Sequence, residues 1–321
     1  MITQTRIILN SESHTVFTGK WTGQWTLAVL TLSLGLLSGC ASPPVPAPRD
    51  ATPVVVAPSP KRAPKIGIAF GGGAARGFAH IGVIQVLEEA GIKPALVTGT
   101  SAGSFVAALY ASGKTAAQLQ QLAETMDEAT FADWTLPIFS RGMLRGEALA
   151  RYVQTAVGGR RIEDMGLPLG IVATDLHSGV GVLFRRGDTA TAVRASSAVP
   201  AIFQPVHIAG RDYVDGGLVS PVPVRYARQM GAELVIAVDI SSSPEVNPAG
   251  DTLQILMQTF TIMGKSINTL ELKDADVVVR PALNSVSSAD FGARRRAIQV
   301  GRDAMLERLP QLKAAIEAAS K

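Results

Sequence analysis

The sequence contains very little cysteine and histidine, and both shortages exclude classes of protein. The single cysteine, Cys40, cannot form an internal disulfide, and it has no partners for a cysteine-rich metal site. Lysine and arginine form no dense tract and the formal net charge is a mild +4, so nothing indicates nucleic-acid binding. The 321 residues include only four histidines, namely His14, His80, His177 and His207.

The N-terminal segment has the pattern of a secretory signal. Residues 25–39 form an apolar run that is shorter than the ~20 residues of a membrane-spanning helix, and Arg6 and Lys20 lie upstream. An apolar run of this length that ends in small residues is typical of a signal peptide. Leu37-Ser38-Gly39-Cys40 resembles the lipobox of bacterial lipoproteins. The resemblance implies that residues 1–39 are removed and that Cys40 is lipidated and tethers the chain to a bacterial membrane.

Two alternatives to the lipoprotein interpretation stay open, an uncleaved anchor and a cleavable signal with an incidental cysteine. Ala41 stands where a signal for inner-membrane retention usually places aspartate, which favours the outer membrane over the inner one. Residues 40–64 are dominated by proline, alanine, valine and serine. Such a composition does not pack and tends towards an extended conformation. We therefore predict a tether between the membrane and a folded part that begins at residue 65.

The folded part opens with an alternation of strand and helix patterns. Residues 66–70 form a short apolar run typical of a buried strand, residues 71–77 form a glycine-rich loop, and residues 78–90 carry apolar side chains at helical spacing. A parallel-rich central sheet flanked by helices, and thus an α/β fold, is expected from this alternation. Further strands are predicted at 94–98, 169–173, 180–184, 234–240 and 277–279, with a helix at 102–111.

The C-terminal residues 246–321 are predicted to form a helical extension that packs on the same domain as residues 65–245. A helical pattern covers residues 289–319, where Pro310 is expected to cause an interruption. Residues 131–144 are apolar without clear periodicity. They are interpreted either as a mobile flap over a site or as a surface loop tucked into the core.

The segment Gly99-Thr100-Ser101-Ala102-Gly103 has the G-x-S-x-G form of a nucleophile elbow. It follows a short apolar strand and opens a helix of small residues, which is the setting that the elbow requires. Glycines are needed at 99 and 103 because the turn is strained and a Cβ on either side would clash. The alternative is a serine that merely caps the helix N-terminus.

The glycine-rich loop follows a strand and precedes a helix, as in nucleotide-binding sites, but its sequence argues against a nucleotide. It lacks Gly-Lys-Ser/Thr, its G-x-G-x-x-G pattern is imperfect, and no acidic residue ends the second strand. Backbone N–H groups beside a nucleophile would instead stabilise a developing oxyanion. We predict Gly72, Gly73 and Ala74 as these donors. Arg76 is expected either to orient the loop or meet a phosphate, or else to be a salt-bridged or solvated charge.

No histidine follows the motif Asp215-Gly216-Gly217, although the α/β-hydrolase order places histidine after the acid. The simplest remaining arrangement is a serine worked directly by an aspartate. Asp-Gly is also a common hairpin turn, and Asp175 and Asp239 near other strand ends are rival acids. An aspartate with an ordinary pKa near 3.9 is a poor base, and burial would raise that pKa and improve it.

The glycine loop with His80-Ile81-Gly82-Val83 behind it, then the elbow, then Asp-Gly-Gly, together resemble the patatin-like phospholipase family. The resemblance runs from about residue 65 to 240. It implies a patatin-like fold and a lipid acyl hydrolase of the phospholipase or lysophospholipase type, with Ser101 as nucleophile, Asp215 as its partner in a Ser–Asp dyad, the glycine loop as oxyanion hole, and no metal or cofactor. Ala74 departs from the glycine pattern but keeps its N–H. The residues that support the motifs are Gly71, Arg76, Gly77, Gly99, Gly103, Gly216 and Gly217.

Residues 173–176 and 195–200 also look like recurrent family segments, which we interpret as supporting the site. The expected partners are a phospholipid or other lipid ester and, through Cys40, a membrane surface. Two alternative functions stay open: a lipoprotein that binds lipid or a partner without catalysis, and an esterase or thioesterase for soluble acyl esters. Arg185-Arg186 and residues 294–296 could contact lipid headgroups, but a solvated surface is the plainer interpretation.

Overall fold

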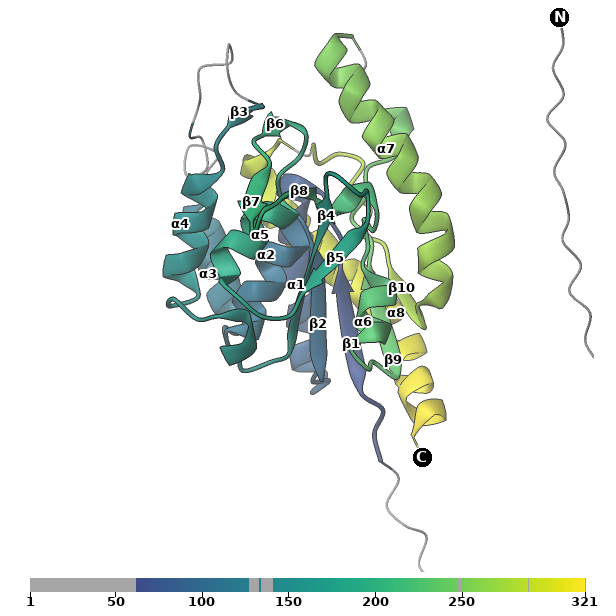
Figure 1. Cartoon of the computed structure of the whole chain (residues 1–321). Helices are drawn as coiled ribbons and strands as arrows, with labels where there is room; N and C mark the ends of the chain where they lie inside the picture. Colours follow the sequence, from purple (N-terminus) through teal and green to yellow (C-terminus); the bar gives the residue numbers. More distant parts are fainter. Residues whose placement is uncertain (1–61, 127–132, 134–140, 247–249, 288, 321) are drawn as a thin grey trace, which may run out of the picture. The chain divides into compact units, whose positions relative to one another are not determined.

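The structure is a computed structural model that describes residues 62–126, 133, 141–246, 250–287 and 289–320 (Figure 1). Ser59–Lys321 make up one compact unit, which contains both the predicted hydrolase segment and the predicted C-terminal extension. The predicted signal peptide, Cys40 and nearly all of the predicted tether lie outside the described residues, as does most of the segment 131–144. Within the described ranges, no helix is long and apolar enough to cross a membrane.

An eight-stranded sheet forms the centre of the fold. Five neighbouring strands run parallel to one another. Three further strands join this group, and each of them pairs antiparallel with the strand to which it is attached. This arrangement confirms the predicted parallel-rich α/β sheet. In spatial order the strands are β10 (Val277–Val279), β9 (Leu234–Val238), β1 (Ile66–Phe70), β2 (Leu96–Thr100), β4 (Leu169–Asp175), β8 (Arg211–Asp215) and β7 (Val206–Ile208), and β5 (Gly181–Phe184) pairs with β4.

The strands at the middle of the sheet are apolar throughout because both of their faces are covered. All residues of β1, β2 and β9 are buried. One face packs on α6 and the other on α1, α2 and α8, and α3 contacts α1 and α2. The helices are α1 (Ala79–Glu89), α2 (Ala102–Ala111), α3 (Ala116–Thr125), α4 (Glu147–Ala156), α5 (Thr189–Ser196), α6 (Val224–Gln229), α7 (Thr252–Glu271) and α8 (Arg294–Ala319), and a small second sheet joins β3 (Gly142–Leu144) to β6 (Ala201–Phe203).

The two edges of β4 are occupied by three strands. β5 pairs with β4 along Ile171–Thr174, so it fills one edge. A strand has only two edges for hydrogen bonding, so β2 and β8 share the other one. β2 pairs as far as Val172, and β8 pairs from Ala173 onwards. The chain leaves the sheet after β2 at the position where β8 begins to pair.

The C-terminal extension is part of the same sheet and helical layer. β10 continues the parallel sheet beside β9, and α8 lies across α1. The two helices approach closely, since a Cβ on Gly82 would lie 2.0 Å from the Ile298 carbonyl oxygen. The predicted interruption at Pro310 is wrong, because α8 continues through it. The carbonyl that loses its N–H partner belongs to Leu306, which is 45% exposed, so water can replace the missing donor.

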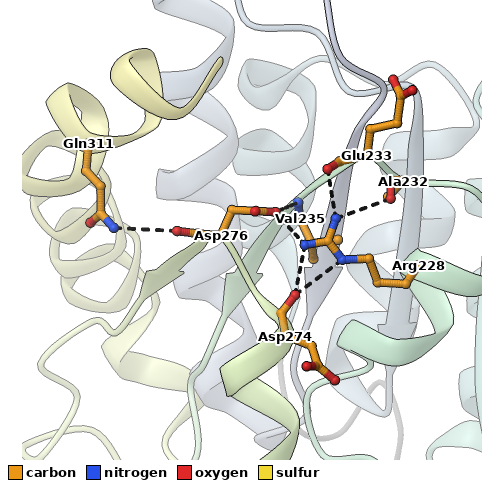
Figure 2. Close-up of polar contacts among 7 residues, drawn as sticks. All are labelled: Arg228, Ala232, Glu233, Val235, Asp274, Asp276 and Gln311. Atoms are coloured by element: carbon orange, nitrogen blue, oxygen red, sulfur yellow. Dashed lines mark hydrogen bonds and ion pairs between the residues drawn. The ribbon is translucent and has the colours of Figure 1, made fainter. Parts of the chain in front are cut away.

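Arg228 at the end of α6 fastens this extension to the sheet (Figure 2). Its guanidinium donates to the Asp274 carbonyl oxygen at 2.9 Å, to the Glu233 carbonyl oxygen at 2.8 Å and to Asp276 Oδ2 at 2.7 Å. Asp276 Oδ2 also accepts a hydrogen bond from the Val235 amide at 2.6 Å. The planar fork of arginine therefore joins α6, β9 and the segment that leads into β10.

Candidate active site

Ser101 lies on a sharp turn between β2 and α2. Its φ of +53° and ψ of −125° place it in a region that residues with a Cβ rarely adopt, as expected of a strained elbow. A Cβ on Gly103 would lie 2.1 Å from the Phe70 carbonyl oxygen, and one on Gly99 would lie 2.4 Å from the Gly103 carbonyl oxygen. The structure thus gives the same reason for these two glycines as the sequence did.

Asp215 ends β8, and its side chain is almost completely buried. The hairpin alternative fails, because a type I′ Asp-Gly turn needs positive φ angles at both residues and neither Asp215, with a φ of −49°, nor Gly216 has one. A short 3₁₀ helix, Gly216–Leu218, follows instead, and Asp215 Oδ1 accepts a hydrogen bond from the Gly217 amide at 2.6 Å. Asp215 Oδ2 is buried, so this oxygen of the carboxylate is shielded from water.

The shared edge of β4 brings Ser101 and Asp215 together. Thr100, the residue before the serine, pairs with Val172, while Asp215 pairs with Ala173. Burial raises the pKa of Asp215 from 3.8 to about 6, and the Ser101 hydroxyl and the Gly217 amide act in the opposite direction. A carboxyl group with this pKa is ionised at neutral pH and is a much better proton acceptor than an exposed aspartate.

The two rival aspartates are occupied elsewhere. Asp175 Oδ1 accepts hydrogen bonds from the His177 and Ser178 amides, and its Oδ2 forms a 2.6 Å ion pair with Arg211, so its pKa is lowered. Asp239 Oδ2 accepts a 3.0 Å hydrogen bond from Arg280. Both carboxylates are therefore engaged in contacts that hold loops in place, and none of these contacts is with the elbow.

The glycine loop lies directly against the elbow. A Cβ on Gly72 would lie 3.2 Å from the Ser101 Cβ. The Gly72 N–H already donates to the Pro221 carbonyl oxygen at 2.9 Å, which removes it from the predicted set of free oxyanion donors. The N–H groups of Gly73 and Ala74 donate to no described residue. The same holds for Ala102, a donor that the sequence reasoning missed although the residue after the nucleophile commonly serves this purpose.

Arg76 and His80 hold the loop from behind. Arg76 is only 4% exposed, which excludes the solvated alternative, and it donates a hydrogen bond to Ser242 Oγ. Burial lowers the pKa of Arg76, and Asp239 offsets part of that effect. His80 Nε2 is 2.8 Å from the Gly71 carbonyl oxygen, and burial lowers the His80 pKa to about 4. A neutral ring at neutral pH donates this hydrogen bond, so His80 is a loop anchor rather than a base.

An apolar cavity of about 430 Å³ extends from Ser101. It follows one face of α2 from Ala102 to Leu109, a span of seven residues or about 10 Å. α3 contributes Leu119, Leu122 and Ala123 to the lining, and β3 and β6 contribute further residues. An extended hydrocarbon chain fits such a space. The lining includes Ala74, Phe105, Leu109, Leu119, Leu122, Met143, Val199, Phe203 and Phe291.

The described residues around the elbow include no set suited to a metal. Across the parts of the chain that the structure describes, no group of three or more histidine, cysteine, aspartate or glutamate side chains could hold a metal ion.

Phe131, Trp134 and the other apolar residues up to 140 that could form a flap lie outside the described residues. Arg141 and residues 142–144 are described, and Met143 and Leu144 line the cavity.

The family model "Patatin-like phospholipase" matches residues 68–228. An uncharacterized NTE family protein of Mycobacterium tuberculosis is 38% identical over 189 residues, which are 59% of this chain and 52% of that protein. Patatin-like phospholipase domain-containing protein 6 of Mus musculus is 36% identical over 198 residues, or 59% of this chain and 14% of that protein. The chain thus spans about half the length or less of these relatives.

Among solved structures, VipD from Legionella pneumophila resembles the chain with a TM-score of 0.54. The superposition covers 78% of this chain and 67% of VipD at 16% sequence identity. At this identity the likeness concerns the fold, and it agrees with the mixed sheet described above.

Proposed function

Because the chain belongs to the patatin-like phospholipase family, we propose that it is a lipid acyl hydrolase with a Ser–Asp dyad. Ser101 Oγ attacks the ester carbonyl carbon while Asp215 accepts the hydroxyl proton. The carbonyl π electrons move to the oxygen, and the resulting oxyanion accepts hydrogen bonds from backbone N–H groups. Gly73, Ala74 and Ala102 are the candidate donors because their N–H groups are not otherwise engaged by described residues.

The remaining steps complete the acylation of Ser101 and then hydrolyse the acyl-enzyme. The tetrahedral intermediate collapses, the bond to the leaving alcohol breaks, and the proton on Asp215 passes to the departing oxygen. Water then attacks the acyl-enzyme, gives its proton to Asp215 and releases the fatty acid, and Ser101 recovers its hydrogen. A raised pKa near neutrality suits a carboxyl group that must both accept and return a proton.

One observation carries this proposal, the placement of Ser101 and Asp215 beside consecutive positions on one edge of β4. It is supported by the apolar cavity that begins at the serine, because a fatty acyl chain needs such a cavity and a small soluble substrate does not. A phospholipid or lysophospholipid is therefore the proposed substrate class, and an esterase for soluble acyl groups is the alternative outcome of the assay.

The decisive experiment is product analysis by mass spectrometry after incubation with mixed bacterial phospholipids. Wild-type protein should release fatty acids, and Ser101→Ala should release none while keeping the same far-UV circular dichroism spectrum. Ser112→Ala is the matched control, since Ser112 ends the same helix and its hydroxyl donates to the Leu109 carbonyl oxygen. Turnover by purified Ser101→Ala, or hydrolysis of short soluble esters alone by the wild type, would contradict the proposal.

We further propose that lipidated Cys40 tethers the enzyme to a bacterial membrane, with the outer membrane favoured. The support is the lipobox-like sequence before Cys40 and the residue Ala41 after it. Metabolic labelling with an alkyne fatty acid should mark the wild-type protein and not Cys40→Ala. Equal labelling of the two proteins, or an intact N-terminus after secretion, would count against the tether.

A further inference from the structure

The last residue of α5 and the two residues after it contact the backbone of both members of the proposed dyad. Ser196 Oγ lies 2.9 Å from the Ser101 amide nitrogen, and the Ala198 carbonyl oxygen accepts a hydrogen bond from the Asp215 amide at 3.0 Å. The neighbours Ser197 and Val199 line the apolar cavity. A segment of three residues, 196–198, thus joins the nucleophile to the carboxylate.

The direction of the Ser196 hydrogen bonds follows from its chemistry. Its Oγ is also 2.5 Å from the Val172 carbonyl oxygen, and a carbonyl oxygen only accepts hydrogen bonds. The single hydroxyl hydrogen of Ser196 therefore points to Val172, and the Ser101 N–H donates to the Ser196 oxygen. Ser196 thus links two backbone groups by hydrogen bonds, and we call this link the Ser196 relay. Ser196 is fully buried, so no water competes for either bond.

The relay fixes the peptide whose rotation decides where the Ser101 hydroxyl points. Ser101 holds a strained φ of +53°, which persists only where surrounding contacts impose it. Val172 is the residue opposite Thr100, so Ser196 ties the turn to the strand that also carries the partner of Asp215. The Ser101 N–H donates to Ser196, so it is unavailable to an oxyanion. The oxyanion must therefore accept its hydrogen bonds from neighbouring amides.

We propose that Ser196 is a positioning residue for acyl transfer, holding the Ser101 turn in register with Asp215 through its hydroxyl group. The inference rests on the proposed Ser–Asp chemistry. Ser196 itself touches neither the substrate nor the proton in flight. Its loss should act on the rate of serine acylation and leave the apolar cavity, and hence substrate binding, nearly unchanged. A displacement of about 1 Å at a reacting group can lower a rate about 100-fold.

The test measures the rate constant for labelling by a fluorophosphonate probe, together with kcat and KM for a lipid ester. Ser196→Ala should lower the labelling rate and kcat by about 10- to 100-fold, with KM changing less than about threefold. The matched control is Thr189→Val at the opposite end of α5, which removes a buried hydroxyl that donates to the Arg160 carbonyl oxygen at 2.7 Å. This control should lose thermal stability and keep the wild-type labelling rate.

A pair of variants with equal shape removes the ambiguity of a folding defect. Ser196→Thr and Ser196→Val add the same bulk and differ in the hydroxyl group alone. The threonine variant should label at least about ten times faster than the valine variant when both are compared per folded molecule. Wild-type labelling of Ser196→Ala, equal rates for the threonine and valine variants, or an equal loss in Thr189→Val would each overturn the inference.

The outcomes also separate this inference from the proposed function. If the wild type does not react with the probe, or if Ser101→Ala reacts as well as the wild type, the Ser101 chemistry itself is refuted. If the wild type reacts at Ser101 and Ser196→Ala reacts equally fast, only the positioning role of Ser196 fails.

Discussion

Thr100 and Asp215 pair with consecutive residues on one edge of β4, namely Val172 and Ala173. Strand register thereby places the proposed acid beside the residue that follows Thr100, although the two lie far apart in the sequence. A slip of one residue in β8 would turn the Asp215 side chain to the other face of the sheet. The positions of the proposed nucleophile and base are therefore a property of the sheet and not of a mobile loop.

The pH dependence of turnover should report Asp215. Its carboxyl group has a pKa of about 6, and only the ionised form can accept the Ser101 proton. We expect kcat/KM to rise about tenfold per pH unit below pH 6 and to level off above it. Stopped assays of lipid ester hydrolysis between pH 4.5 and 9 measure this profile.

A histidine could produce a similar acid limb, and variants distinguish the two. His177 lies in the turn after β4, and His207 in β7 contacts Asp212. The double variant His177→Gln, His207→Gln should keep the limb at about pH 6. A limb that disappears in this variant would assign the proton acceptor elsewhere than Asp215.

Replacement of Asp215 should increase stability at neutral pH and abolish activity. The folded-state pKa exceeds that of the unfolded chain, so the native state binds the extra proton between pH 3.8 and 6 and stability falls as pH rises through that range. A difference of about two between the folded and unfolded pKa corresponds to a destabilisation of roughly 3 kcal/mol at most. The wild type carries this destabilisation in full above pH 6. Urea unfolding should show Asp215→Asn to be more stable than the wild type at pH 7.5, with the gap closing towards pH 4. A variant that is less stable at pH 7.5 would show that the buried carboxylate is not strained.

The length of the cavity should set the preference for acyl chains. Leu122 on α3 lines the cavity, so Leu122→Trp would reduce the space for a long acyl chain while Ser101 on its own turn is unchanged. We expect kcat/KM for a palmitoyl ester to fall about tenfold or more and that for a butyryl ester to stay within about twofold. Parallel assays of the two esters test this, and equal losses would mean that the acyl chain lies elsewhere.

The Arg228 cluster should affect stability and not catalysis. The single nitrogen of a lysine ammonium group cannot occupy the positions of the two guanidinium nitrogens that contact Glu233, Asp274 and Asp276 (Figure 2). Arg228→Lys should lower the free energy of unfolding by about 1–3 kcal/mol and leave kcat within about twofold. Arg186→Lys, at an exposed position, is the control with no expected change. A large loss of kcat in Arg228→Lys would show that this edge of the sheet is coupled to the site.

The local parts of the fold could be predicted from the sequence because local residues determine them. Apolar runs such as 66–70 and 234–238 form the buried strands, and the glycine spacing around Ser101 predicted the elbow. The choice of Asp215 over Asp175 and Asp239 depended on family resemblance. The structure adds a physical reason, since both rivals are engaged by arginines.

The remaining features depend on contacts between distant segments, which leave no local signal. The Gly72 N–H is engaged by Pro221, Ser196 is one of two adjacent serines at the end of a small-residue helix, and Gly82 meets α8 through its backbone. Pro310 was misjudged because helix geometry inside a packed layer can outweigh the loss of one hydrogen bond at an exposed turn. None of these positions could be recognised before the register of β4 and the packing of α1 on α8 were known.

The central claim is most directly tested by locating a fluorophosphonate adduct by peptide mass spectrometry in the wild type and in Asp215→Asn. The account predicts stoichiometric modification of Ser101 in the wild type, and in the folded Asp215→Asn variant a labelling rate lower by about 10²–10⁴-fold. An adduct on another residue, or labelling of Asp215→Asn at the wild-type rate, would contradict it.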